Sequence, residues 1–235
     1  MKYHFITFAT PNGSYLKDAN ALCASAMTVA KFDTALIGGI PSLDPLFKTQ
    51  NAHILQHSKG AGYWLWKPFV ILKRLTELQD GDVLCYCDSS YRFLSDVRKI
   101  ADEWLNDGDI GACHNKPNDP KWKEHTDHKY TKHDTFVLMK VPSGKERELI
   151  KSTLQAWGGF VLLRKSNDSM AFVREWLHYA QNAQIITDNR SVMGKEALGF
   201  LENRHDQSIY SILLKLKKIK MHHMDKQFLH NNRMP

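Results

Sequence analysis

The stretch GDVLCYCDSS, residues 81–90, decides the fold because it joins an apolar run to polar residues at its end. Side chains alternate along a strand, so Val83, Cys85 and Cys87 share one face, whereas Asp88 lies on the other. Both faces are apolar up to that point, which is typical of an interior strand in a sheet covered on both sides. Asp88 therefore falls at the carboxyl end of a central strand, where open α/β sheets bind their ligands.

The two cysteines of this stretch allow two interpretations, a metal or redox pair and a pair of packed side chains. Residues two apart on a strand are separated by about 6–7 Å, which is too far for a disulfide. As metal ligands, Cys85 and Cys87 would need two further soft partners on the same face. Because free cysteine is among the most buried residue types, we interpret both as core residues.

Composition limits the class of protein. The chain has 235 residues, of which 43% are hydrophobic, so one domain spanning residues 1–235 can bury a sizeable core. No apolar run is long enough for a spanning helix, and the opening MKYHFITFAT does not resemble a signal peptide. Four cysteines in a chain this long favour reduced thiols, and we expect a cytoplasmic protein.

The net charge of +7 favours an anionic partner. Nucleic acid, an acidic membrane surface and a phosphate-bearing small molecule all meet that condition. The basic run KLKKIK, residues 215–220, supports the first two, although its lysines lie on the polar side of an amphipathic helix, which is usually a solvated face. We treat residues 206–235 as a basic helix and tail.

Hydrophobic periodicity divides the chain into alternating strands and helices. Strands are expected in YHFITFAT, TALIGGI, VLCYCD, DIGACH and GGFVLLRK. Helices are expected at about residues 14–30, 68–78, 95–105, 145–155, 167–182 and 206–220. This alternation indicates a layered α/β fold.

The polar segment 114–135 contains several histidines and acids. A zinc site is one interpretation of this group, because imidazole and carboxylate both bind zinc. The segment has no paired CxxC and its spacings match no closed-site pattern, so a loop that orders over a ligand is favoured. The residues concerned are His114, His125, His128, His133, Asp127 and Asp134.

Polar residues at the ends of three elements, far apart in the sequence, need a common explanation. Lys67 lies at the start of a helix whose first turn contains Pro68, and helix N-termini attract anions. Asp88 ends a strand, and His205-Asp206-Gln207 opens another helix. Each also has a structural interpretation: Lys67 as a surface residue and Asp206 as a helix cap.

Several sequence blocks, in this order, resemble a group of bacterial and viral glycosyltransferases of the GT-A superfamily. The resemblance covers most of residues 1–215 and is most specific in the first and last blocks. It implies a Rossmann-like three-layer α/β fold with a central mixed, mainly parallel sheet that binds a nucleotide-diphosphate sugar at its carboxyl edge. The blocks are GYWLWKP (62–68), CYCDSS (85–90), YTKHD (130–134), GGFVLLRK (158–165) and RHDQS (204–208).

The resemblance also assigns roles to individual residues. Asp206, Gln207 and His205 would be catalytic, with Asp206 holding the sugar or serving as a base and Gln207 lying beneath the anomeric carbon. Gly158 and Gly159 would let the backbone approach the sugar or the acceptor. The implied donor-binding residues are Thr7, Thr10, Trp64, Lys67, Asp88, Ser89, Ser90, Gly158 and Gly159.

A divalent metal is part of the usual GT-A site, where two carboxylates of a DxD motif hold Mn²⁺ or Mg²⁺ against the diphosphate. Asp88 matches the first carboxylate, but Ser90 stands at the third position. A C-terminal histidine often completes such a site, and His222, His223 and His230 are the available residues. We expect Mn²⁺ or Mg²⁺ bound through Asp88.

These features predict a glycosyltransferase that moves a hexose-type sugar from a nucleotide-diphosphate sugar, with a UDP-sugar favoured. The acceptor would be a glycan or a lipid-linked glycan in surface polysaccharide synthesis, and the enzyme would work at the inner face of the membrane through peripheral contact. The alternative is a nucleic-acid-binding or nucleic-acid-processing protein that uses its basic surface, which salt-dependent binding would reveal.

Overall fold

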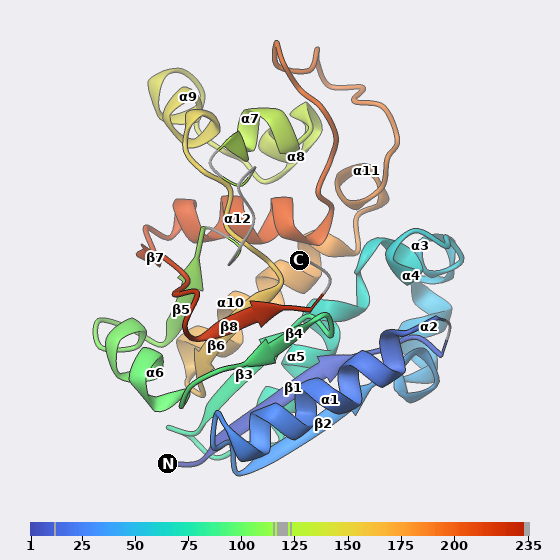
Figure 1. Ribbon diagram of the computed structural model, residues 1–235. Helices are drawn as coiled ribbons and strands as arrows, with labels where there is room; N and C mark the ends of the chain where they lie inside the picture. The colour runs from blue at the N-terminus through green and yellow to red at the C-terminus, as the bar shows by residue number, and fades with distance from the viewer. Residues whose placement is uncertain (12, 115, 117–121, 123, 233–235) are drawn as a thin grey trace.

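The computed structural model describes residues 1–235 except 12, 115, 117–121, 123 and 233–235 (Figure 1). Its strands are β1 (Tyr3–Phe8), β2 (Thr34–Gly38), β3 (Val83–Cys87), β4 (Tyr91–Phe93), β5 (Ile110–Cys113), β6 (Phe160–Arg164), β7 (Met221–His222) and β8 (Leu229–Asn231). Its longer helices are α1 (Tyr15–Thr28), α5 (Trp66–Thr76), α6 (Arg98–Trp104), α9 (Lys145–Ser152), α10 (Asn167–Ala180) and α12 (Asp206–Leu216). The shorter ones are η1 (Ile40–Ser42), α2 (Pro45–Gln50), α3 (Ala52–Leu55), α4 (Gly60–Tyr63), α7 (Asp127–Tyr130), α8 (His133–Leu138) and α11 (Ala183–Ile186).

A six-stranded sheet with the order β2-β1-β3-β6-β5-β7 forms the centre of the molecule. The β1–β2, β1–β3 and β5–β7 pairs are parallel, whereas β6 runs antiparallel to both of its neighbours. The sheet is therefore mixed and mainly parallel, as the sequence predicted. A separate two-stranded sheet pairs β4 with β8.

Helices cover both faces of the central sheet (Figure 1). One core contains side chains of α5, α10 and α12 packed on Leu84 and Tyr86 of β3. The other contains side chains of α1, α6 and the β4–β8 sheet packed on Cys85 and Cys87. Both cysteines are fully buried, so the alternation predicted for β3 and the core role of its cysteines are confirmed.

Local differences from the sequence prediction are confined to short elements. The segment 114–135 was expected to be a loop, but it contains α7 and the start of α8. Helix α10 begins one residue after Ser166, whose side chain caps it by accepting from the Ser169 amide. Within the described residues, no helix combines the length and the apolar character needed to cross a membrane.

Candidate functional site

A cavity of about 750 Å³ opens at the carboxyl ends of β1, β2 and β3. Aromatic and apolar side chains form one part of its wall, and hydroxyl groups and a carboxylate form the other. The structure therefore brings together Thr10, Trp64, Asp88, Ser89 and Ser90 from the donor residues that the sequence predicted. The remaining wall is formed by Phe8, Pro11, Tyr15, Ile40, Ser58, Gly60, Ala61, Trp66 and Tyr86.

Lys67 lies behind this cavity and joins three segments of the chain. Its Nζ donates to the Gly158 carbonyl at 3.0 Å and lies 3.0 Å from Asp206 Oδ2 and 3.5 Å from Asp88 Oδ1. The residue is only 3% exposed, and these three oxygens lie around its ammonium. The resemblance assigns Lys67 to the donor-binding residues; in the structure it lies outside the cavity wall, within ion-pair distance of both Asp88 and Asp206.

The protonation of this group follows from burial and charge. Burial opposes the ammonium, but the carboxylates of Asp206 and Asp88 outweigh it and raise the pKa of Lys67. Burial also raises the pKa of Asp206 to about 6, against the opposing effect of Lys67. Tyr86 donates to Asp88 Oδ1 at 2.8 Å, and burial followed by the Asp88 charge raises the pKa of that phenol. Asp88 is the more accessible carboxylate, with 37% of its side chain exposed.

The GAGYW segment, residues 60–64, carries Trp64 to the cavity in an unusual conformation. All five residues have positive φ, from 49° at Ala61 to 94° at Gly62, so α4 is a left-handed turn. A Cβ at Gly62 would lie 2.7 Å from the Leu55 Cα, which explains the glycine. For L-residues this conformation costs roughly 1–2 kcal/mol each, and such strain is concentrated at functional sites.

Trp64 in turn stacks on His205, with ring centroids 5.4 Å apart. His205 also has a positive φ of 57°, and its Nδ1 lies 2.7 Å from the Ile186 carbonyl oxygen. Burial lowers the pKa of His205 to about 4, so the ring is neutral at pH 7. His205 is 2% exposed and packs the start of α12 against Trp64. It is not one of the residues that line the cavity.

Gln207 is held by a buried polar network that the sequence did not reveal. Its Oε1 accepts from the Gly158 amide at 3.1 Å, and its Nε2 donates to Gln155 Oε1 at 2.6 Å. Gln155 Nε2 lies 3.1 Å from Asp127 Oδ1, and the other oxygen of Asp127 pairs with Lys215. The Gln207 amide therefore has a fixed orientation next to Asp206.

Gly158 and Gly159 were expected to let the backbone approach the substrate. In the structure they lie close to the side chains of Gln207 and Asp88. A Cβ at Gly158 would lie 3.1 Å from Gln207 Cβ. A Cβ at Gly159 would lie 2.6 Å from Asp88 Oδ2. The glycines thus allow the start of β6 to pass between Asp88 and Gln207.

Thr7, also assigned to the donor site, is fully buried and donates to the Cys87 carbonyl at 2.7 Å. It does not line the cavity.

The described residues do not form a metal site around Asp88. Nowhere in the described part of the chain do three His, Cys, Asp or Glu side chains gather in a way that could hold an ion. Asp88 Oδ1 already accepts from Tyr86 and lies close to Lys67, while Ser90 supplies no carboxylate. The expected Mn²⁺ or Mg²⁺ stays a prediction.

The three C-terminal histidines lie in different places. His222 is on β7, which is separated from β3 by the two strands β6 and β5, and its ring stacks on that of Trp104 at a centroid distance of 5.1 Å. His223 contacts the ring of His114 at 4.1 Å. His230 is on β8 opposite Arg92 of β4, the strand that follows Asp88. The structure therefore separates His222 from Asp88 and leaves His230 in the neighbouring small sheet.

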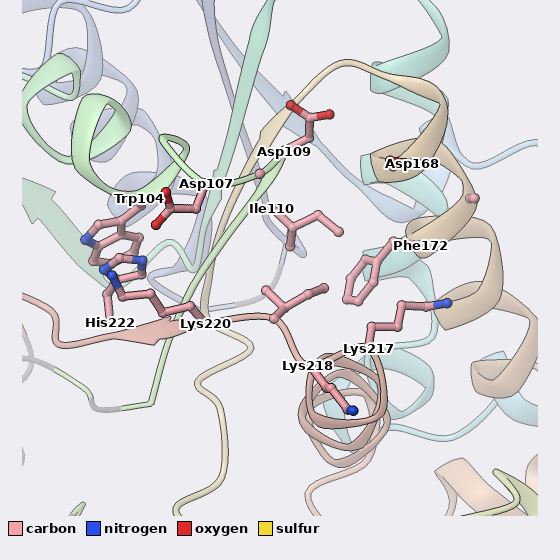
Figure 2. Close-up of a pocket in the computed structure, with 13 residues that line it drawn as sticks. Trp104, Asp107, Asp109, Ile110, Asp168, Phe172, Lys217, Lys218, Lys220 and His222 are labelled. Carbon is pink, nitrogen blue, oxygen red and sulfur yellow. The ribbon is translucent and has the colours of Figure 1, made fainter.

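The basic run after α12 lines a second cavity of about 470 Å³, shown in Figure 2. Lys217, Lys218 and Lys220 share this cavity with acidic side chains, among them Asp107 and Asp109. The run therefore does not form a purely basic surface, and it gives the nucleic-acid alternative no support. The cavity also contains His222 and lies apart from Asp88 and Asp206.

Comparisons with solved structures return glycosyltransferases at 12–13% sequence identity. No protein-family model matches the sequence, and neither does any curated protein. Mouse xyloside xylosyltransferase 1 in its apo form has a TM-score of 0.49 at 12% identity over 96% of this chain and 86% of that one. The galactosyltransferase LgtC, in complex with donor and acceptor sugar analogues, has a TM-score of 0.42 at 13% identity over 91% of this chain and 70% of that one.

The apo structure of WbbM, a bifunctional glycosyltransferase, has a TM-score of 0.51 at 12% identity. The alignment covers 90% of this chain and 37% of WbbM, so the chain corresponds to about a third of that protein. At this identity the likeness concerns the fold, which agrees with the sheet order and the two helical layers described above. The chain has the Rossmann-like α/β fold of GT-A glycosyltransferases, as the sequence predicted.

Proposed function

We propose that this chain is a glycosyltransferase that moves a hexose-type sugar from a nucleotide-diphosphate sugar, with UDP favoured, to a glycan or lipid-linked acceptor. The observation that carries the proposal is the cavity at the carboxyl ends of β1–β3, with Asp88 in its wall and the Lys67–Asp206 pair directly behind. Ligands of open α/β sheets bind at this edge.

The cavity suits a nucleotide sugar in size and in chemistry. Its volume of about 750 Å³ lies within the range of small-molecule sites. The aromatic part, with Phe8 and Trp66 stacked at a centroid distance of 3.7 Å, offers flat surfaces for a base. The hydroxyls of Thr10, Ser89 and Ser90 offer donors to phosphate or sugar oxygens.

The charges of the site suit the bond that must break. Cleavage of the sugar–phosphate bond leaves positive charge on the sugar and negative charge on the departing diphosphate. Fixed charges in a site shielded from water act strongly on such developing charge. Asp88 and Asp206 favour the positive sugar, and the Lys67 ammonium holds the two carboxylates close together.

Acceptor, pathway and location are also part of this proposal. The resemblance of the GYWLWKP and RHDQS blocks supports a role in surface polysaccharide synthesis, and the net charge of +7 is compatible with peripheral contact at the inner face of the cytoplasmic membrane. Binding of a divalent metal together with the diphosphate belongs to the proposal only as an expectation carried by the same resemblance.

Calorimetric titration with UDP, GDP and other nucleoside diphosphates tests the proposal first. Release of the nucleotide from the matching sugar donor into water then gives an activity that needs no known acceptor. Asp206→Asn should bind the nucleotide within about threefold of the natural chain but lose about 10²–10³ in donor turnover, the cost of removing one preorganised charged group. The matched control is Asp168→Asn, an acid of the cavity in Figure 2, which should change neither value.

Two results would oppose the proposal. The first is that none of the nucleotides binds, because the cavity at the end of β1–β3 would then have another ligand. The second is that Asp206→Asn and Asp168→Asn turn over the donor equally fast.

A further inference from the structure

The YTKHD block, residues 130–134, has no role in the donor site, but it holds the segment between α11 and α12 in place. The Lys132 ammonium donates to the Thr187 carbonyl at 3.1 Å and to the Asn189 carbonyl at 3.0 Å. Asp134 accepts from the backbone amides of Val192 at 2.9 Å and Met193 at 3.0 Å. Figure 1 shows this segment leaving α11, rising beside α8 and returning to α12.

The segment and the block together enclose a third cavity, of about 630 Å³. Its wall contains three cations, Lys132, Arg190 and Lys195. Lys132 is 2% exposed, yet among the described residues no carboxylate lies within ion-pair distance of its ammonium. Arg190 and Lys195 likewise have no ion pair within the part of the chain that the structure describes.

Two of the three acidic residues of the same wall are already paired with cations. Asp188 pairs with Lys59 at 2.9 Å, and Glu202 pairs with Arg204 at 2.9 Å. Glu196 accepts from the His133 backbone amide at 2.7 Å. The wall therefore holds three cations without an ion pair and one carboxylate, that of Glu196, that also has none within the described residues. Burial lowers the pKa of Lys132, against the opposing charges of Asp134, Glu196 and Asp188.

This cavity adjoins the donor site through a short chain of contacts. Trp64 lines the donor cavity and stacks on His205. His205 Nε2 lies 3.7 Å from Asp188 Oδ1, and Asp188 lines the third cavity. Since His205 directly precedes Asp206, this chain of contacts links the third cavity to the start of α12, where the proposed catalytic carboxylate lies.

We propose that the third cavity is the acceptor subsite and that it binds a phosphate group carried by the acceptor. This inference rests on the proposed function and names the chemistry of its second substrate. A buried ammonium flanked by an arginine and a second lysine suits a compact, multiply charged anion, because charge-assisted hydrogen bonds to phosphate are strong and directional. A soluble sugar phosphate and a lipid headgroup both carry this phosphate chemistry, and the two arms of the test below distinguish them.

Inorganic pyrophosphate is the probe, titrated calorimetrically into the chain already saturated with UDP or with whichever nucleotide binds. The variant is Arg190→Ala/Lys195→Ala, whose two side chains are exposed and can be removed without disturbing the core. The matched control, Lys218→Ala/Lys220→Ala, removes the same charge from the cavity in Figure 2. Flotation with vesicles of phosphatidylglycerol or of phosphatidylcholine forms a second arm with the same proteins.

The expected result is saturable pyrophosphate binding that is weakened about tenfold or more in the Arg190/Lys195 variant and changed less than twofold in the control. Loss of phosphatidylglycerol binding in the same variant would identify a lipid as the source of the phosphate. Phosphate binding without vesicle binding would identify a soluble acceptor.

Equal weakening in the two double variants, or no binding in either arm, would overturn the acceptor subsite. Failure of every nucleotide to bind would count against the proposed function instead. The pyrophosphate titration can then be run without nucleotide, and the two variants still decide it.

Discussion

Lys67→Met removes the ammonium that lies between Asp206 and Asp88 while keeping most of the side-chain volume. Removing one partner of a buried ion pair costs about 3–5 kcal/mol of unfolding free energy, and we expect that loss at about pH 8. Asp206 is 2% exposed and its pKa is raised to about 6 even with Lys67 present. At about 1.4 kcal/mol per pKa unit, ionising it in the folded state already costs about 3 kcal/mol relative to the unfolded chain.

The loss should depend on pH in a definite direction. Without Lys67 the folded-state pKa of Asp206 rises further, so the folded variant retains a proton that the natural chain has released. A group whose folded state binds the extra proton loses stability as pH rises. The variant should therefore differ less from the natural chain at about pH 5, where Asp206 is largely protonated in both, than at about pH 8.

Urea denaturation at the two pH values measures the effect. Lys59→Met is the control, because its pair with Asp188 is about 43% exposed and such pairs contribute about 0–1 kcal/mol. Adding Asp206→Asn to Lys67→Met should restore part of the stability at about pH 8. Equal losses at both pH values, or a Lys67 variant no less stable than the Lys59 control, would refute the electrostatic argument.

Three further expectations concern the same site. Asp88→Asn should bind UDP in EDTA at least as tightly as the natural chain, because it removes a partly exposed negative charge from the cavity wall proposed to face the diphosphate; calorimetry that shows tenfold weaker binding would contradict this. Donor turnover should rise through about pH 6, since burial raises the pKa of Asp206 to about 6 and the carboxylate must be ionised to stabilise the sugar cation; a flat profile would exclude that role. Gly159→Ala should lower the unfolding free energy by about 1–3 kcal/mol, because its Cβ would lie 2.3 Å from Trp157 Nε1; an unchanged melting temperature would disprove the close packing.

Sequence periodicity predicted the parts of the fold that repeat a simple pattern. The alternation through residues 83–88 placed Cys85 and Cys87 in one core and Asp88 at the sheet edge, and both placements are confirmed. Pro68 correctly indicated a helix start, since α5 begins at Trp66. These features depend on neighbours in the sequence, which a pattern can record.

The site depended on contacts that no local pattern records. Lys67 could be placed at a helix start, but its burial follows from Gly158 and Asp206, which lie far along the chain. The network through Gln155 also joins distant segments. Helices α7 and α8 were predicted as loop because they are only four and six residues long, too short for a clear apolar period.

Residues 60–64 form a left-handed turn, a backbone conformation that D-amino acids prefer and L-amino acids avoid. Ala61 has φ 49° and ψ 52°, which is the ordinary helical conformation of a D-amino acid. A chain assembled chemically with D-alanine at position 61 would relieve strain that every L-residue there must bear, whereas D-alanine at Ala26 in the right-handed α1 would introduce it. The handedness that presents Trp64 to His205 is therefore held against the backbone preference of the L-residues that adopt it.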